Sequence, residues 1–185
     1  MSETRFQLRL ERMLRGQSHA EALDGQDFDD EHLTLVTFSL EGSQFALPVS
    51  LIDEVVPSAQ IVPIPGAQGW IAGMMPYRTR IVPVLDIRRK LGFAPGKNMH
   101  HILICQVNDT LLGLAVDFAS NVITIHREDY AGDQTGHSER SIQTIINRND
   151  QAIIVLDFHS LVSAAELSTI ASLIEKTEEQ HAMAI

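Results

Sequence analysis

Few residues in this chain combine the type and the spacing that catalysis or metal binding requires. Asp53 and Glu54 form an acidic pair flanked by apolar residues, and paired carboxylates can act as a general acid and a general base. Because they are chain neighbours, we expect the two side chains to point apart, which favours a solvated face or a partner contact over acid–base chemistry. His100 and His101 are also adjacent, and in a strand they would face opposite sides. Neither pair predicts a catalytic or metal site.

The common catalytic and cofactor motifs are absent from the sequence. The eight His residues are dispersed and show neither HExxH nor CxxC spacing. There is no GxSxG, no phosphate-cradling Gly-rich loop and no dinucleotide fingerprint. Cys105, the one cysteine, lies in the apolar run 102–107 and is expected to be a buried thiol. We therefore expect a protein that is not an enzyme, with no cofactor and no metal.

Composition narrows the kinds of partner. The chain has 185 residues, enough for one domain or for two small subdomains with a common core, and 44% of them are apolar. Its net charge is −10 and its 14 Lys and Arg are scattered, which argues against nucleic-acid binding. The N-terminus lacks the apolar core of a signal peptide, and no run reaches membrane-spanning length. We expect a cytoplasmic protein without direct membrane insertion, whose partners are proteins or small molecules.

The elements that must position these residues are centred on the stretch 71–93. The apolar run 81–85 predicts a buried strand, and Pro83 within it removes a backbone donor, which indicates an edge strand or a bulge. Asp86 is placed to cap a short helix that Gly92 closes, with Arg88 to Lys90 near the helix's negative C-terminal end.

The same order of strand, Asp and short helix recurs at 152–162, where Asp157 lies 71 residues after Asp86. A second pair of segments, 37–49 and 104–116, aligns with Phe45 placed 67 residues before Leu112. These offsets predict a duplicated β unit. The alternative is that buried strands resemble one another through composition alone.

The remaining pattern predicts a mainly β domain over 32–180. Hairpins are expected at 33–49, 102–116 and 141–156, a helical turn or strand corner at 50–56, and a further strand at 122–125. Ser163 and Glu166 form a capping box ahead of a helix that we expect to pack on the β core. Its apolar stripe is Leu167, Ile170, Ala171 and Ile174. Residues 1–31 are a polar extension, either disordered or carrying a short amphipathic docking helix, and 181–185 form a tail.

Four blocks of sequence, in order and at characteristic spacing, carry a family resemblance. They are LVTFSL (35–40), FALPV (45–49) and IDEVV (52–56); IVPIPG (61–66) and GMMPYR (73–78); IVPVLDIR (81–88); and GLAVD (113–117), Val122 and IVLD (154–157). Over 33–175 the chain resembles the chemotaxis coupling protein family CheW and the CheW-like domain of the histidine kinase CheA. The resemblance implies two SH3-like five-stranded β-barrel subdomains that share a hydrophobic core, with short helical turns and a C-terminal α-helix.

The resemblance also implies a function and a site. The function is that of a non-enzymatic adaptor that couples the cytoplasmic tip of a methyl-accepting chemoreceptor to a CheA-type histidine kinase, at receptor arrays on the inner face of the membrane. Ile52, Glu54 and Val55 would form one partner-facing corner, and Arg78 would occupy the family's matching Arg position, unless it merely pairs with a nearby acid. The alternatives are a small-molecule-binding β-barrel sensor and an auxiliary protein of pilus-based motility.

One motif departs from the family. Pro76, Tyr77, Arg78 and Thr79 stand where the family usually has Asn-Leu-Arg-Gly. Because Thr disfavours positive φ, we expect Thr79 at negative φ or a remodelled turn. The proline and the large amphipathic Tyr77 ring predict a stiffer tip and a shifted partner specificity.

Overall fold

The computed structural model describes residues 32–58, 61–94, 99–107, 110–126, 128 and 141–182, with side chains described up to residue 174. The predicted extension 1–31 lies outside this part, and of the predicted tail 181–185 only residues 181 and 182 lie within it, in a helix. The elements are β1 (His32–Leu40), β2 (Ser43–Pro48), η1 (Val49–Leu51), β3 (Ile52–Pro57), β4 (Ile71–Tyr77), β5 (Arg80–Leu85), η2 (Ile87–Arg89), β6 (His101–Val107), β7 (Thr110–Val116), β8 (Phe118–His126), β9 (Ile142–Arg148), β10 (Gln151–Leu156), α3 (Phe158–Leu161) and α4 (Ala164–Ala182).

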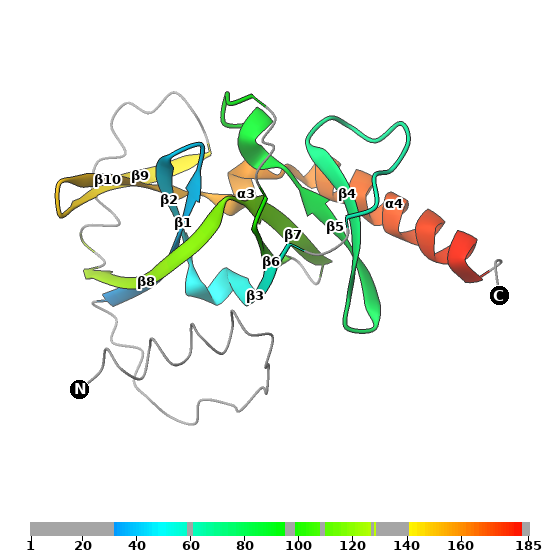
Figure 1. Ribbon diagram of the computed structural model, residues 1–185, viewed down its shortest axis with the longest axis horizontal. Coiled ribbons are helices and arrows are strands. Elements are labelled where there is room, and N and C mark those ends of the chain that lie inside the picture. Colours follow the sequence, from blue (N-terminus) through cyan, green and yellow to red (C-terminus); the bar gives the residue numbers. More distant parts are fainter. Residues whose placement is uncertain are drawn as a thin grey trace.

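The strands form two five-stranded sheets lying side by side, as Figure 1 shows. The first has the order β8-β1-β2-β10-β9 and the second the order β3-β6-β7-β5-β4. The chain starts in the first sheet, builds the whole second sheet, and returns to the first with β8 to β10. The expected mainly β architecture with two five-stranded units is therefore confirmed.

The strand register confirms the internal duplication. In each sheet, a strand that is followed directly by a capping Asp forms a parallel pair with the second strand of a hairpin. These pairs are β10 with β2 and β5 with β7. Val155 lies opposite Ala46, and Val84 lies opposite Gly113, so the two pairs differ by the offsets 71 and 67 found in the sequence. Asp86 and Asp157 both accept backbone N–H groups at the start of a short helix.

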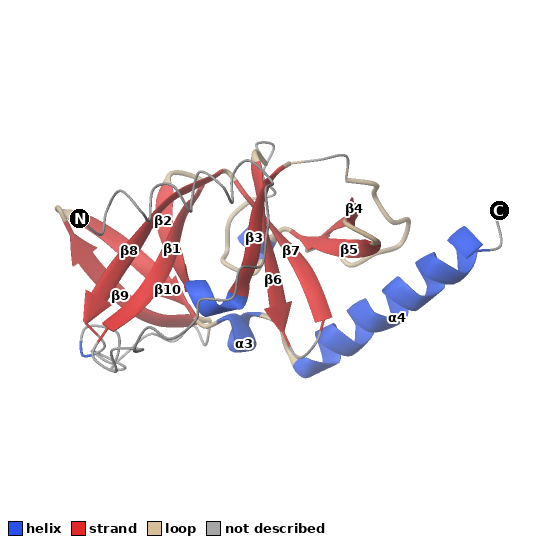
Figure 2. Cartoon of the chain, turned by 90° about the horizontal axis from the view of Figure 1, so that it is seen from below, coloured by secondary structure: helices blue, strands red, loops and turns tan. Residues whose placement is uncertain are grey.

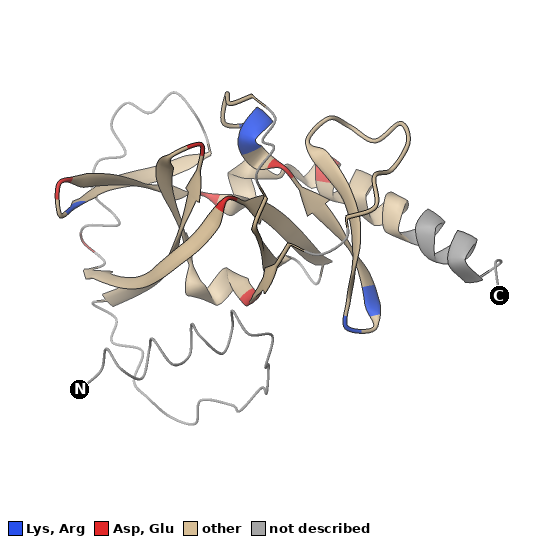
Figure 3. Cartoon of the chain, viewed as in Figure 1, with Lys and Arg blue, Asp and Glu red and all other residues tan. Residues whose placement is uncertain are grey.

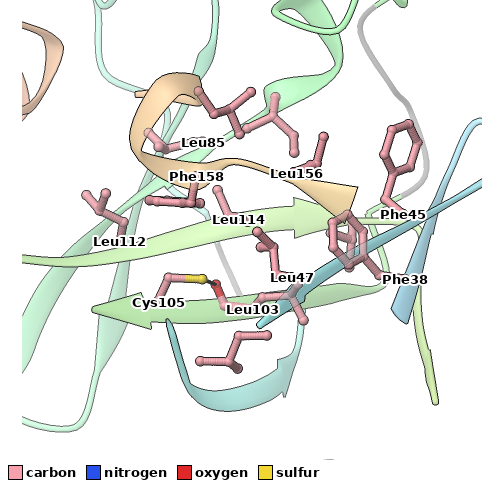
Figure 4. Packing of buried hydrophobic residues seen from close by; sticks show 14 of the residues in the cluster. Phe38, Phe45, Leu47, Leu85, Leu103, Cys105, Leu112, Leu114, Leu156 and Phe158 are labelled. Atoms are coloured by element: carbon pink, nitrogen blue, oxygen red, sulfur yellow. Dashed lines mark hydrogen bonds between the residues drawn. The ribbon is translucent and has the colours of Figure 1, made fainter. Parts of the chain in front are cut away.

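The two sheets share one hydrophobic core and each keeps a smaller one of its own. The shared core combines Phe38, Phe45 and Leu47 of the first sheet with Leu103, Leu112 and Leu114 of the second, as Figure 4 shows. The smaller cores are the cluster of Met75, Tyr77, Val82, Val84, Ile102, Ile104 and Ala115, and the cluster of Leu35, Ala46, Ile125, Ile153 and Val155. The shared core packs the two sheets into one unit.

Cys105 lies in the shared core, as predicted. It is fully buried on β6, and burial raises the pKa of its thiol to about 12 because the thiolate would lose its hydration. The residue therefore serves as a small apolar side chain.

Pro83 is not on an edge strand, contrary to one of the two readings of the sequence. β5 is flanked by β4 and β7, but its pairing with β7 includes only Val84 and Leu85. Pro83 therefore precedes the paired residues of β5 and β7, and its lack of a backbone N–H removes no hydrogen bond between these two strands. The outer strands β3 and β4 of this sheet are not paired with each other, so its described strands do not close into a barrel through backbone hydrogen bonds.

Arg88 forms a buried ionic cluster between the sheets. Its side chain is 0% exposed, and its guanidinium contacts Asp86 at 2.9 Å, Glu41 at 3.3 Å and the carboxylate of Asp117. Glu41 lies in the β1–β2 turn, and Asp117 links β7 of the second sheet to β8 of the first. The cluster therefore ties together segments of both sheets, a role unlike the helix-end cation expected from the sequence.

Helix α4 starts against β5 and then leads away from the sheets, as Figures 1 and 2 show. The predicted capping box is present, since the Glu166 carboxylate accepts from the backbone N–H of Ser163 at 2.9 Å and the Ser163 hydroxyl accepts from the N–H of Glu166 at 3.3 Å. Ile170 is buried, but Ala171 is exposed, because the helix presents Leu173 to the core in its place. No described helix is long and apolar enough to cross a membrane.

Lys90 fastens the start of α4 to the second sheet. Its ammonium donates to the Glu166 carboxylate and to the Leu161 carbonyl, each at 2.7 Å, and lies 4.5 Å from the centre of the Trp70 ring. Burial alone would raise the pKa of Glu166, but the hydrogen bonds from Lys90 and Ser163 outweigh it and hold that pKa below its usual value.

This contact predicts a pH-dependent loss of stability in Lys90→Met. A carboxyl whose pKa is lower in the folded state stabilises the fold above its unfolded pKa, and this contribution disappears as pH falls through the folded pKa. We expect the variant to lose about 1–2 kcal/mol of unfolding free energy at neutral pH, as for a largely buried charged hydrogen bond, since the Lys90 and Glu166 side chains are 16% and 25% exposed. Urea unfolding across pH measures it. The gap between parent and variant should shrink as pH falls below about 4, and a gap that stays constant in that acidic range would assign the effect to packing on Trp70.

Candidate partner-binding site

The β4–β5 hairpin ends in a two-residue loop, Arg78-Thr79, between the paired residues Tyr77 and Arg80. Arg78 has a φ of 54°, whereas Thr79 is not among the residues at positive φ. A positive φ at only the first loop position is the φ pattern of a type II′ turn. Thr79 thus avoids positive φ, as expected, and the residue of this loop at positive φ is Arg78.

Glu54 of β3 is a buried carboxylate beneath this loop. Its side chain is 6% exposed, and it accepts a hydrogen bond from the Tyr77 hydroxyl at 2.5 Å and from the Arg78 guanidinium at 3.1 Å. The guanidinium is 4.9 Å from the centre of the Tyr77 ring, close enough for a cation–π contact. Two donors therefore reach one buried carboxylate, and one of them, the guanidinium, also lies over the Tyr77 ring.

Asp53 reaches the same hydroxyl, which contradicts the expectation that the acidic pair points apart. Its carboxylate lies 2.9 Å from the Tyr77 oxygen and 3.6 Å from the Arg78 guanidinium. The pairing of β3 with β6 has a register shift between Ile52 and Glu54. A bulge of this kind redirects side chains locally, so neighbours need not alternate between faces.

The surroundings of Tyr77 and Arg78 keep the Tyr77 phenol neutral and the Arg78 guanidinium charged. Burial raises the pKa of the Tyr77 hydroxyl far above its usual value, and the hydrogen bonds to Glu54 and Asp53 raise it further. For Arg78, burial would lower the pKa, but Tyr77, Asp53 and Glu54 together raise it. Tyr77 therefore remains a hydrogen-bond donor at any physiological pH.

The structure brings together only part of the residue set proposed from the sequence. Glu54, Tyr77 and Arg78 are in direct contact, whereas Ile52 and Val55 are buried in the shared core and present no side chain to a partner. Ile52 and Val55 lie before and after the bulge in β3, and both side chains point into the core.

The exposed part of the site is a basic loop in an acidic chain. Arg78 is half-exposed, with 50% of its side chain accessible, and Pro76, Thr79 and Arg80 are exposed beside it. Figure 3 shows basic residues at the free end of the β4–β5 hairpin. Asp53 and Arg80 were not among the site residues proposed from the sequence. The two Arg residues spaced two apart at a short loop could have indicated Arg80.

His100 and His101 both contact the same aromatic ring, although adjacent residues of a strand were expected to face opposite sides. The rings of His100 and His101 both contact Phe118, with centroid distances of 4.7 and 5.9 Å. His101 Nδ1 accepts from the backbone N–H of Ala119 at 3.3 Å, and burial together with the charge of His100 lowers the pKa of His101. Within the described ranges, no three His, Cys, Asp or Glu side chains are grouped so that they could hold a metal ion.

The two duplicated sheets and their common core define a double β domain of the SH3-like kind. The CheW-like domain family model matches residues 34–166, which is most of the chain. The chain therefore belongs to the CheW-like domain family.

Individual relatives agree with this assignment. The chain is 27% identical over 154 residues to a chemotaxis protein CheW of Treponema pallidum, covering 78% of this chain and 91% of that one. It is 26% identical over 117 residues to protein PilI of Pseudomonas aeruginosa, covering 62% and 66%. The crystal structure of the scaffolding protein TtCheW from Thermoanaerobacter tengcongensis has the same fold, with a TM-score of 0.66, 23% identity, and coverage of 80% of this chain and 96% of that chain.

Proposed function

We propose that this protein is a non-enzymatic adaptor that couples the cytoplasmic tip of a methyl-accepting chemoreceptor to a CheA-type histidine kinase. It acts on the inner face of the membrane, at receptor arrays. The observation that supports this most directly is the family match over residues 34–166, together with relatives named as chemotaxis CheW proteins.

An adaptor of this kind works by raising local concentration. A chain that binds a receptor and a kinase at the same time makes the encounter of those two partners effectively intramolecular. The double fold suits the task because one shared core holds two sheets in a fixed relation, so that contacts on each can be made together. No chemical step by this chain is needed.

The proposal is tested by measuring how tightly the chain binds each of the two partners separately. Purified chain is titrated, by calorimetry, with a receptor cytoplasmic fragment and with the kinase regulatory region. We expect saturable binding to each. Absence of binding to both would contradict the proposal, and binding to a small metabolite with no affinity for either protein would favour the barrel-sensor alternative.

Arg78 is the side chain that we expect to matter most for affinity. It is half-exposed at the hairpin tip, and its pairing with Glu54 and Asp53 is a partly solvated interaction. We expect Arg78→Ala to weaken partner binding about tenfold or more, as an interface Arg can, while changing the unfolding free energy by about 1 kcal/mol or less. Arg80→Ala at the same tip is the matched control for net charge. A loss of stability that fully accounts for the loss of binding would mean that Arg78 is structural.

A second candidate function is supported by one relative, protein PilI. The chain would then be the corresponding auxiliary protein of a pilus-based system, with the same adaptor mechanism and a different receptor and kinase. Calorimetry with both kinds of receptor fragment distinguishes them, since the preferred pair binds more tightly.

A further inference from the structure

The side chains beneath the hairpin tip join two strands that the backbone leaves apart. β3 and β4 are the two outer strands of the second sheet, and they are not paired with each other. Tyr77 of β4 spans this gap, with its hydroxyl 2.5 Å from Glu54 and 2.9 Å from Asp53 of β3. Arg78 reaches Glu54 from the same side at 3.1 Å.

The Tyr77 hydroxyl has one hydrogen and can donate it to only one carboxylate at a time. Glu54 is the closer acceptor and is almost wholly buried, while the Asp53 side chain is 37% exposed and can be served by water. The donors to Glu54 are Tyr77, which is fixed inside the small core of the second sheet, and Arg78, which is half-exposed.

This difference decides what happens when a partner competes for Arg78. A partner carboxylate that attracts the guanidinium must draw it away from Glu54. If Arg78 were the sole donor, its departure would leave a buried carboxylate without a hydrogen bond, which is strongly unfavourable. With Tyr77 in place, Glu54 keeps a short hydrogen bond after Arg78 has moved.

We propose that Tyr77 is a positioning residue that keeps Glu54 hydrogen-bonded and thereby makes Arg78 available to an acidic segment of the partner. The inference rests on the proposed adaptor function for the part that Arg78 plays in binding. Where the resemblance implies an aliphatic residue, Tyr77 supplies a hydrogen-bond donor that an aliphatic side chain lacks. The β3 corner and the β4–β5 tip then act as one contact region.

The main test variant is Tyr77→Phe, which removes the hydroxyl and keeps the ring under the guanidinium. Glu54 should then hold Arg78 more tightly. We expect the Arg78 Nε–Hε group to become more ordered in NMR relaxation of the isolated protein. We also expect partner affinity to fall about tenfold, the size of one charge-assisted hydrogen bond, although Arg78 itself is intact.

Two further variants separate positioning from simple structural support. In the Arg78→Ala background, Tyr77→Phe should cause no additional loss of affinity. In the Tyr77→Phe background, Glu54→Gln removes the charge that holds Arg78 and should restore both its mobility and partner binding. Glu54→Gln in the parent chain should make Arg78 less ordered and leave affinity at least equal to that of the parent, which tests the inference even where Tyr77→Phe folds poorly.

Unchanged order of Arg78 in Tyr77→Phe would overturn the inference, and so would an equal loss of affinity with and without Arg78. The NMR measurement needs no partner. Failure of every variant, parent included, to bind receptor or kinase would instead contradict the proposed function.

Discussion

Arg88→Met should lower the free energy of unfolding by about 3–5 kcal/mol, the range for removing one member of a buried ionic cluster. The Arg88 side chain is fully buried, and the carboxylates of Asp86 and Asp117 that it contacts are largely buried too. Methionine fills similar space without a charge, so the expected loss comes from two largely buried carboxylates that lose their positive partner. Because the cluster joins both sheets, we expect unfolding to stay a single transition at a lower denaturant midpoint.

The matched control is Arg89→Met, one residue further along the same short helix, where the side chain is exposed. It should change stability by less than about 0.5 kcal/mol, as most surface substitutions do. Arg88→Lys keeps the charge but loses the planar fork that reaches several acids, so it should fall between the two. Equal, small losses for Arg88→Met and Arg89→Met would show that the buried cluster does not hold the sheets together.

Gly73→Ala should be nearly as damaging, for a reason of space and backbone geometry. Gly73 has a φ of 150°, and a Cβ there would lie 2.3 Å from the carbonyl oxygen of Val62. The loop cannot simply retreat, because Val62 and Met74 exchange two backbone hydrogen bonds of 2.8 and 2.9 Å. Strain and loss of these bonds together should cost about 3 kcal/mol or more, measured by urea unfolding.

Gly92→Ala is the control for backbone strain without a clash. Gly92 also has a positive φ, of 79°, but a Cβ there would meet no atom within 4 Å. We expect a cost of about 1 kcal/mol, which is the usual penalty of a left-handed conformation for alanine. If both glycine variants lose the same amount, the close approach of Val62 contributes nothing.

Most of the fold could be predicted from sequence patterns among neighbouring residues. The hairpins, the capping aspartates and the duplication follow from alternating apolar residues, turn residues and repeated spacing, all of which act over a few neighbours. The turn at Asn149 and Asp150, both at positive φ, is an example of residues suited to the conformation that they adopt.

What the sequence did not predict depends on contacts between distant segments. Arg88, Arg89 and Lys90 look alike in the chain, yet the first is buried between the sheets, the second is exposed and the third binds α4. Likewise the bulge in β3 turns Asp53 and Glu54 toward one hydroxyl. Neither outcome has a local signal, because each is decided by which strand lies opposite.

The proposed adaptor function requires one molecule of this chain to hold a receptor and a kinase at the same time. Sedimentation velocity of a mixture of the chain, a receptor cytoplasmic fragment and a CheA-type kinase measures this most directly. We expect a boundary that sediments faster than any pairwise complex and contains all three proteins, and we expect Arg78→Ala to diminish it. Pairwise complexes that exclude one another, with no three-component boundary at any ratio, would contradict the proposed adaptor function.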